Sequence, residues 1–193
     1  MFCFFIVLVN FRTHITSIMF RKITATLVIL VFLLSCKNAK KTETVSENPI
    51  HVSSDAGKKW NVFGVAITGK ILSEETDGAY TVIMTETPPA GGPPKHVHEH
   101  EDELFYVLKG TYEFYCGDQT MTAKKGDMVR LPKGIPHHFK NIDSITGITM
   151  NTITPGGFEH FFDEIAAIAK QRKPTRQEID SIANNYGMKF LKN

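Results

Sequence analysis

The chain has 193 residues, with 22 lysines and arginines against 20 aspartates and glutamates, and 42% of its residues are hydrophobic. This is ordinary globular composition for about one domain, which excludes collagen-like, coiled-coil and wholly disordered chains. The charges are nearly balanced and form no basic stripe, so we expect no nucleic acid partner. The three cysteines, Cys3, Cys36 and Cys116, are too few and too scattered for a disulfide framework or a thiolate zinc site.

The N-terminal region has the layout of a secretory signal peptide. Arg21 and Lys22 precede an apolar run over residues 23–34, which is shorter than the roughly 20 residues that a membrane-spanning helix needs. The run ends in Leu-Leu-Ser-Cys36, which resembles the lipobox of bacterial lipoproteins, whose cysteine is lipidated after cleavage. The resemblance implies a lipid anchor at Cys36 and a periplasm-facing place in the bacterial envelope. An uncleaved anchor and plain secretion are the alternatives.

The same region predicts how the chain is divided. A second apolar run lies before the positive charges, so we expect Met19 to be the true start and residues 1–35 to be the signal peptide. Residues 36–57 begin with a polar stretch that has no apolar periodicity, and they are predicted to be a flexible linker. We expect a folded barrel over residues 58–155 and a helical extension over residues 156–193.

The barrel segment predicts an all-β fold. Short β-like runs alternate with Gly, Pro and Asp turns, and no helical period extends over any length. The sequence gives eight predicted strands, enough for a jelly roll: 61–68, 79–87, 104–108, 111–116, 119–123, 127–131, 137–141 and 147–154. Gly110 and the pair Gly117-Asp118 fall where tight hairpins need positive φ angles, which agrees with this assignment.

Two helices are predicted after Pro155. Apolar residues from Phe158 to Ala169 recur at three- and four-residue spacing, as on an amphipathic helix. A second helix is predicted to start with a capping box from Thr175 to Glu178 and to end at Gly187. We expect the pair to cover an open edge of the barrel rather than to bind a ligand.

The segment from Gly91 to Glu103 carries the residues with the clearest chemistry. Side chains at i and i+2 of a strand point to one face, so His96 and His98 can aim two imidazoles at one point inside a barrel. Glu103 could return a carboxylate to that point, and His137 follows a Pro/Gly turn that leads into another strand. Three imidazoles and one carboxylate suit one divalent transition metal, namely Fe, Mn, Ni, Cu or Zn.

These residues resemble the two conserved motifs of the cupin superfamily. The first motif is matched by the set His96, His98, Glu103 and Gly110. The second is matched by the set Gly126, Pro132, Gly134, His137 and Asn141. The first motif departs from the family in one respect, since its leading glycine falls on Ala90, with Gly91 one place late.

The resemblance implies a fold and a function. Around the motifs the chain looks like single-domain cupins compared with quercetin 2,3-dioxygenases. It implies a double-stranded β-helix with His96, His98, Glu103 and His137 as metal ligands. The implied activity is a dioxygenase that uses O₂ on a small phenolic or enediol-like substrate, with Glu103 as catalytic base. An envelope-anchored metal-dependent binding module and an oxygen-independent isomerase or lyase remain open, and cupins commonly form homodimers.

Other residues near the motifs are assigned differently. His100 is expected in a turn, behind the ligands at most, and His138 should face outward. A solvated acidic turn is expected at Glu99, Glu101 and Asp102. Aromatic residues predicted as core rather than as a surface for substrate are Trp60, Phe63, Tyr106, Phe114 and Phe139. Cys116 is expected to be a small buried residue.

Overall fold

The computed structural model describes residues 48–191. The strands in this part of the chain are β1 Lys58–Val62, β2 Val65–Ile71, β3 Thr81–Thr87, β4 His96–His98, β5 Asp102–Lys109, β6 Thr111–Cys116, β7 Gln119–Lys124, β8 Met128–Leu131, β9 His137–Asn141, β10 Gly147–Thr154 and β11 Met188–Phe190. The helices are the 3-10 turn η2 Ser73–Glu75 and the α-helices α2 Glu159–Ala169 and α3 Arg176–Asn185.

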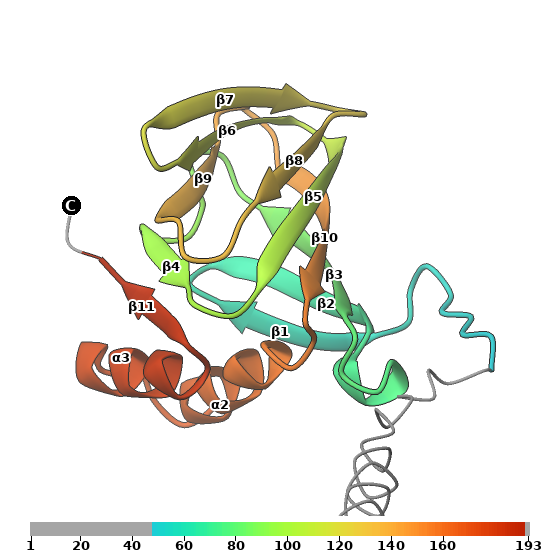
Figure 1. Cartoon of the computed structure of the whole chain (residues 1–193), viewed down its shortest axis with the longest axis vertical. Coiled ribbons are helices and arrows are strands. Elements are labelled where there is room, and N and C mark those ends of the chain that lie inside the picture. The colour runs from blue at the N-terminus through green and yellow to red at the C-terminus, as the bar shows by residue number, and fades with distance from the viewer. Residues whose placement is uncertain (1–47, 192–193) are drawn as a thin grey trace, which may run out of the picture. The chain divides into compact units, whose positions relative to one another are not determined.

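The strands form two antiparallel sheets that pack face to face (Figure 1). One sheet has the order β1-β2-β3-β10-β5-β8, and the other has the order β11-β4-β9-β6-β7. Strands far apart in the sequence are neighbours, as where β10 lies between β3 and β5. The described chain is therefore a cupin-like jelly roll followed by helices, which confirms the predicted fold class.

Two clusters of buried side chains form the core. The first joins the inner faces of the two sheets and contains Phe105, Val107, Tyr112, Phe114, Ala123, Val129, Leu131 and Phe139. The second combines β1, β2 and β3 with α2, α3 and β11, and its largest members are Trp60, Phe158, Phe161 and Phe162. Full burial of each large apolar side chain stabilises the fold by about 1.5–3 kcal/mol.

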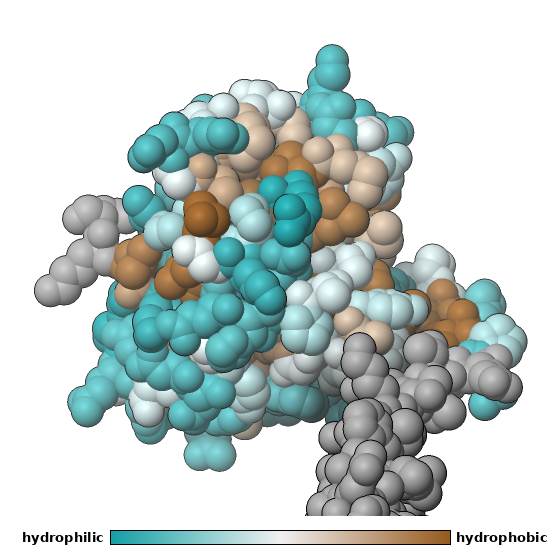
Figure 2. Space-filling model, viewed as in Figure 1, coloured by the Kyte–Doolittle hydropathy of each residue, from teal (hydrophilic) through white to brown (hydrophobic). Residues whose placement is uncertain are grey.

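The two helices lie close to their predicted boundaries, and α2 packs on β1 whereas α3 packs on β11. The capping box is present, since the Thr175 side chain accepts a hydrogen bond from the Glu178 amide, and Gly187 has a φ of 67° just after α3. Asp163 of α2 accepts a hydrogen bond from Trp60 Nε1 at 2.8 Å, which ties the helix to β1. The surface over α2 and α3 is largely hydrophilic in the view of Figure 2, as expected of amphipathic helices.

The list of eight predicted strands lacked β4, and it was wrong in two further places. The run over residues 61–68 is broken by Phe63 and Gly64, whose φ angles of 55° and 80° form a two-residue hairpin turn between β1 and β2. The chain after Gly187 does not end as a helix tail but forms β11, which pairs with β4 (Figure 1). A three-residue strand is too short to give a recognisable alternation in the sequence.

The N-terminal predictions lie outside the described residues. This holds for the signal peptide over 1–35, the start at Met19, the lipidation site Cys36 and the first part of the linker. Between residues 48 and 191, none of the helices has the length and apolar character needed to cross a bilayer.

Candidate metal centre

Four buried side chains meet inside the barrel. His96 and His98 come from β4, Glu103 from β5 and His137 from β9. One nitrogen or carboxylate oxygen of each lies within 4.8 Å of the corresponding atoms of the other three. His96 and His98 share a face because they are two residues apart on a strand, and His96 lies opposite His137 in the sheet. The structure thus brings together the four residues that were predicted as ligands.

The segment before β4 positions the first two histidines. The Ala90 amide donates to the Asn141 carbonyl and the Asn141 amide donates to the Gly91 carbonyl, both at 2.9 Å, so this segment lies against the end of β9. A Cβ on Gly92 would lie 2.0 Å from the Phe139 carbonyl oxygen, so only glycine allows this approach. Ala90, where the family motif has glycine, has a left-handed φ of 60°. That conformation costs an alanine about 1–2 kcal/mol.

Hydrogen bonds hold all three imidazoles by the nitrogen that faces away from the centre. Nδ1 of His96 lies 2.7 Å from the Pro94 carbonyl oxygen, and Nδ1 of His137 lies 2.9 Å from the Ile135 carbonyl oxygen. Nδ1 of His98 lies 3.2 Å from a carboxylate oxygen of Glu101. Because each Nδ1 donates, the Nε2 atoms are the ones that can bind a metal, and this outer shell of acceptors is typical of metal-binding histidines.

Glu101 was wrongly predicted as part of a solvated turn. Its exposed fraction is only 7%, because the turn between β4 and β5 folds it back beneath His98. The other two acidic residues are more exposed. Glu99 pairs with Lys189, and Asp102 accepts hydrogen bonds from Arg130 and from the Lys133 amide. The three-residue separation of His98 and Glu101 was the available sequence signal.

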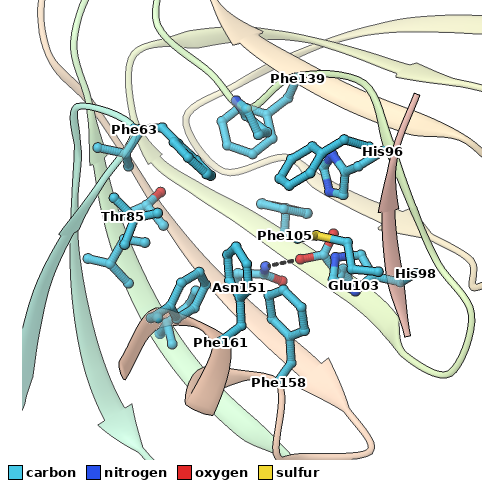
Figure 3. A pocket seen from close by; sticks show the side chains of 18 residues that line it. Phe63, Thr85, His96, His98, Glu103, Phe105, Phe139, Asn151, Phe158 and Phe161 are labelled. Carbon is cyan, nitrogen blue, oxygen red and sulfur yellow. Dashed lines mark hydrogen bonds between the residues drawn. The ribbon is translucent and has the colours of Figure 1, made fainter. Parts of the chain in front are cut away.

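Asn151 is a residue of the site that the sequence analysis missed. It lies on β10 with an exposed fraction of 2%, and its Nδ2 donates to Glu103 Oε1 at 2.7 Å (Figure 3). The other oxygen of Glu103 lies 3.1 Å from His137 Nε2. Both carboxylate oxygens are therefore held in place. A polar residue at an inward position of a strand was the only sign in the sequence.

Burial and charge shift the pKa values of the cluster in opposite directions. Burial, followed by repulsion from His98 and His137, lowers the pKa of His96 to about 3. Burial would raise the pKa of Glu103, but the hydrogen bond from His137 and the nearby imidazoles lower it to about 2. The same carboxylate raises the pKa of His137 despite its burial. The cluster thus provides an ionised carboxylate and a neutral imidazole at His96, which are the ligand forms that a metal requires.

An apolar cavity of about 90 Å³ is lined by three of the four residues, His96, His98 and Glu103 (Figure 3). Phenylalanine rings from both core clusters surround it, among them Phe105 and Phe139 from the barrel and Phe158 and Phe161 from the segment that opens α2. Phe63, predicted as core, is 43% exposed and lines the cavity. The helical extension therefore covers β1 and also forms one wall of the cavity.

Of the remaining sequence predictions, some agree with the structure and others do not. Trp60 and Phe114 are core residues as predicted, whereas Tyr106 is only half-buried. His138 lies outside the cluster, where its ring stacks on Tyr115 at 4.3 Å between centroids. His100 is exposed and lies next to Gly187. Cys116 is half-buried against the barrel core.

Comparison with known proteins gives matches over the barrel. Residues 83–147 match the family model of the cupin domain. Over 89 residues the chain is 30% identical to "Quercetin 2,3-dioxygenase" of Bacillus subtilis, a match that covers 46% of this chain and 26% of that protein. It is 33% identical over 90 residues to "Probable germin-like protein subfamily 2 member 5" of Arabidopsis thaliana, covering 41% of each chain. The chain thus spans less than half the length of these two relatives.

Solved structures share the fold. KdgF from Halomonas sp. superimposes with a TM-score of 0.52 at 13% identity, covering 58% of this chain and 99% of that one. A predicted oxalate decarboxylase from Thermotoga maritima superimposes with a TM-score of 0.50 at 22% identity, covering 55% and 99%. At these identities the likeness shows the fold alone. Together with the match over residues 83–147 and the two sequence motifs, it supports the cupin superfamily for this chain.

Proposed function

We propose that the chain binds one divalent transition metal through His96, His98, Glu103 and His137, and that it is a dioxygenase for a small phenolic or enediol-like substrate. The observation that carries the metal site is the orientation of the three imidazoles. Each has its Nδ1 held by an acceptor, and their ligand atoms and that of Glu103 lie within 4.8 Å of one another. Such a donor set fits Fe, Mn, Ni, Cu or Zn.

The cavity supports an aromatic substrate. Its walls are mainly phenylalanine and aliphatic side chains, which favour a planar apolar body and exclude water from the ligand cluster. The similarity to the protein named "Quercetin 2,3-dioxygenase" points to the same class, although it covers only 26% of that protein.

Glu103 is the group that would take up a proton. Among the described residues that line the cavity it is the one carboxylate, and its two oxygens are held by Asn151 and His137. A base must lie within hydrogen-bond reach of the proton that it removes, and Glu103 is among the residues that a hydroxyl in this cavity could contact. A metal bound at the cluster would supply Lewis acidity and a template that orients the substrate and O₂.

Metal analysis combined with an oxygen electrode tests this function. The unaltered chain is compared with the His96→Ala/His98→Ala variant and with His138→Ala, a control that removes a neighbouring histidine outside the cluster. We expect about one metal per chain in the unaltered protein and the control, none in the double variant, and oxygen uptake with flavonols or catechols. Metal without uptake would contradict the dioxygenase and favour a binding module. Product formed without oxygen would favour an isomerase or lyase.

We also propose that the protein is an exported lipoprotein, cleaved before Cys36 and anchored by that residue. The support is the order of charges, apolar run and Leu-Leu-Ser-Cys36 in the sequence. Metabolic labelling with a radioactive fatty acid should mark the chain and should fail to mark Cys36→Ser. Equal labelling of both chains, or labelling of neither, would contradict the anchor.

A further inference from the structure

The cavity meets solvent where three of its lining residues lie. Phe63 is exposed, and Pro93 and Phe190 are half-buried, whereas every other lining residue within 48–191 is buried. The Phe63 and Phe190 rings meet edge to face, with 5.8 Å between their centroids. Figure 3 shows the Phe63 ring pointing into the cavity. A ligand that enters through this mouth, formed by Phe63, Pro93 and Phe190, must therefore pass the two rings.

Phe63 is the less firmly held of the two rings. Phe190 belongs to β11, which pairs with β4, and the Arg176 guanidinium lies 5.3 Å from the centre of the Phe190 ring. Phe63 belongs to the two-residue turn between β1 and β2, and a Cβ added to the next residue, Gly64, would meet no atom within 4 Å. Rotation about the side-chain bonds can carry the exposed Phe63 ring outward without displacing a strand.

The turn itself favours a residue other than phenylalanine. Phe63 and Gly64 both have positive φ angles, of 55° and 80°. Hairpin turns of this kind favour asparagine followed by glycine, and a bulky residue at positive φ is a strained exception. The Phe63 side chain is 43% exposed, so it gains less from burial than the rings of the core. Backbone strain at the edge of a site points to a role in the site rather than in stability.

The cavity is small for an aromatic ligand. Its volume is about 90 Å³, whereas a cavity of about 150 Å³ can hold benzene. One ring would need Phe63 to shift outward, and two fused rings would need it to leave the mouth altogether.

We propose that Phe63 sets the size of the ligand at this site, as a movable ring that limits the substrate to one aromatic ring. The inference rests on the proposed function, since it concerns the same cavity. It narrows the proposed substrates to single-ring phenols such as catechols and excludes larger ring systems such as flavonols.

Binding of toluene and naphthalene tests the proposal. Neither probe has an oxygen or nitrogen atom that could ligate a metal or contact Glu103, so binding reports on the size of the cavity alone. Isothermal titration calorimetry on the full chain should show that naphthalene binds no more tightly than toluene. A cavity without this limit should bind naphthalene about tenfold more tightly, because the second ring buries additional apolar surface.

Three variants assign the limit to the Phe63 ring. Phe63→Ala and Phe63→Asn remove the ring, and each should bind naphthalene about tenfold more tightly than toluene. Phe63→Asn also supplies the asparagine-glycine pair that this turn favours, so its melting temperature should match or exceed that of the unaltered chain. Phe63→Tyr keeps the ring and should keep the ratio of the unaltered chain.

Three binding results would overturn the proposal: tighter binding of naphthalene than of toluene by the unaltered chain, an unchanged ratio in both variants without the ring, or no binding of either probe to any of these chains. Unfolding of Phe63→Asn would also overturn it, since the ring would then be needed by the core. Metal content and oxygen uptake test the proposed function separately, and their failure would leave the two probe ratios unchanged.

Discussion

Glu101 shows how the proposed metal ligands depend on the side chains behind them. It is the acceptor for His98 Nδ1, and such outer partners typically contribute tenfold to a hundredfold in metal affinity. We expect Glu101→Ala to weaken metal binding by that factor, measured by competition with a coloured chelator. Glu99→Ala is the matched control, since Glu99 lies in the same turn but points to Lys189. Equal losses in the two variants would show that the turn, rather than the His98 contact, is responsible.

Glu159 is the buried carboxylate that joins the start of α2 to the chain before β3. It accepts hydrogen bonds from the Ser73 amide at 2.7 Å and from the Thr81 hydroxyl at 2.6 Å. Burial alone would raise the pKa of Glu159, but these hydrogen bonds lower it below its usual 4.5. The folded pKa lies below the unfolded one, so this stabilisation is fully present above about pH 4.5 and is lost as the pH falls through the folded value.

The Glu159→Gln variant tests this account. It should lose about 1–3 kcal/mol of unfolding free energy at pH 7, because it leaves buried donors poorly paired. The difference from the unaltered chain should shrink as the pH is lowered from 4.5, measured by urea denaturation across that range. Glu74→Gln, an exposed change next to Ser73, is the control. A difference that stays constant with pH would show that the carboxylate charge is not what stabilises this junction.

The clustering of the four proposed ligands could be predicted from the sequence because their positions follow from local rules. His96 and His98 share strand parity, and the turns before Glu103 and His137 are marked by their residue types. The roles of Glu101 and Asn151 could not be predicted in the same way. The first depends on how one turn folds back, and the second depends on the register between β10 and β5, which pairs residues almost 50 positions apart.

At the scale of elements, the strand that carries two ligands depends on the C-terminal strand. β4 has three residues and touches β9 through a single pair, His96 and His137, whereas β11 pairs with it along its whole length. The Glu99 amide also donates to the Gly187 carbonyl, and the Leu191 amide donates to the Lys95 carbonyl. β11 and its flanking residues therefore hold both ends of β4 by backbone hydrogen bonds. Met188 and Phe190 of β11 also line one side of the cavity.

Truncation of the chain tests whether pairing with β11 holds β4 in place. A chain that ends at Gly187 should bind metal at least tenfold more weakly and should melt at a lower temperature, because β4 would lose its main partner strand. A chain that ends at Leu191 keeps β11 and should match the full chain in both respects. Chelator competition and calorimetry measure the two effects. Unchanged metal affinity in the shorter chain would show that β9 and the turns alone position the histidines.

The elements differ in how well the sequence predicted them. α3 was predicted closely because its capping box and its terminal glycine are local signals. The hairpin at Phe63 was missed because a phenylalanine with positive φ is uncommon, and the residue was assigned to the middle of a strand. β11 depends on pairing with β4, which lies about 90 residues earlier, and nothing local marks it.

At the scale of the whole molecule, the alternation of short apolar runs and turns predicted the fold class. The same pattern did not predict the cavity. The cavity forms where the second core cluster, built partly from the C-terminal helices, meets the barrel core. Its wall therefore combines segments separated by most of the barrel sequence. The pattern of most segments predicted burial, although Phe63 and Glu101 were assigned wrongly. It could not show which buried rings would face a cavity and which would pack against each other.

Metal binding should be coupled to the stability of the whole fold, since the ligands come from three strands of both sheets. A metal that binds only the folded chain adds about 2.7 kcal/mol at a free concentration of 100 times Kd. For a domain of this size that corresponds to a rise in Tm of about 5–10 °C. Calorimetry with and without Zn²⁺ or Mn²⁺ measures the shift, which should vanish in His96→Ala/His98→Ala and persist in His138→Ala. A shift that survives the double variant would mean that the stabilising ion binds elsewhere, because two of the four ligands have then been removed.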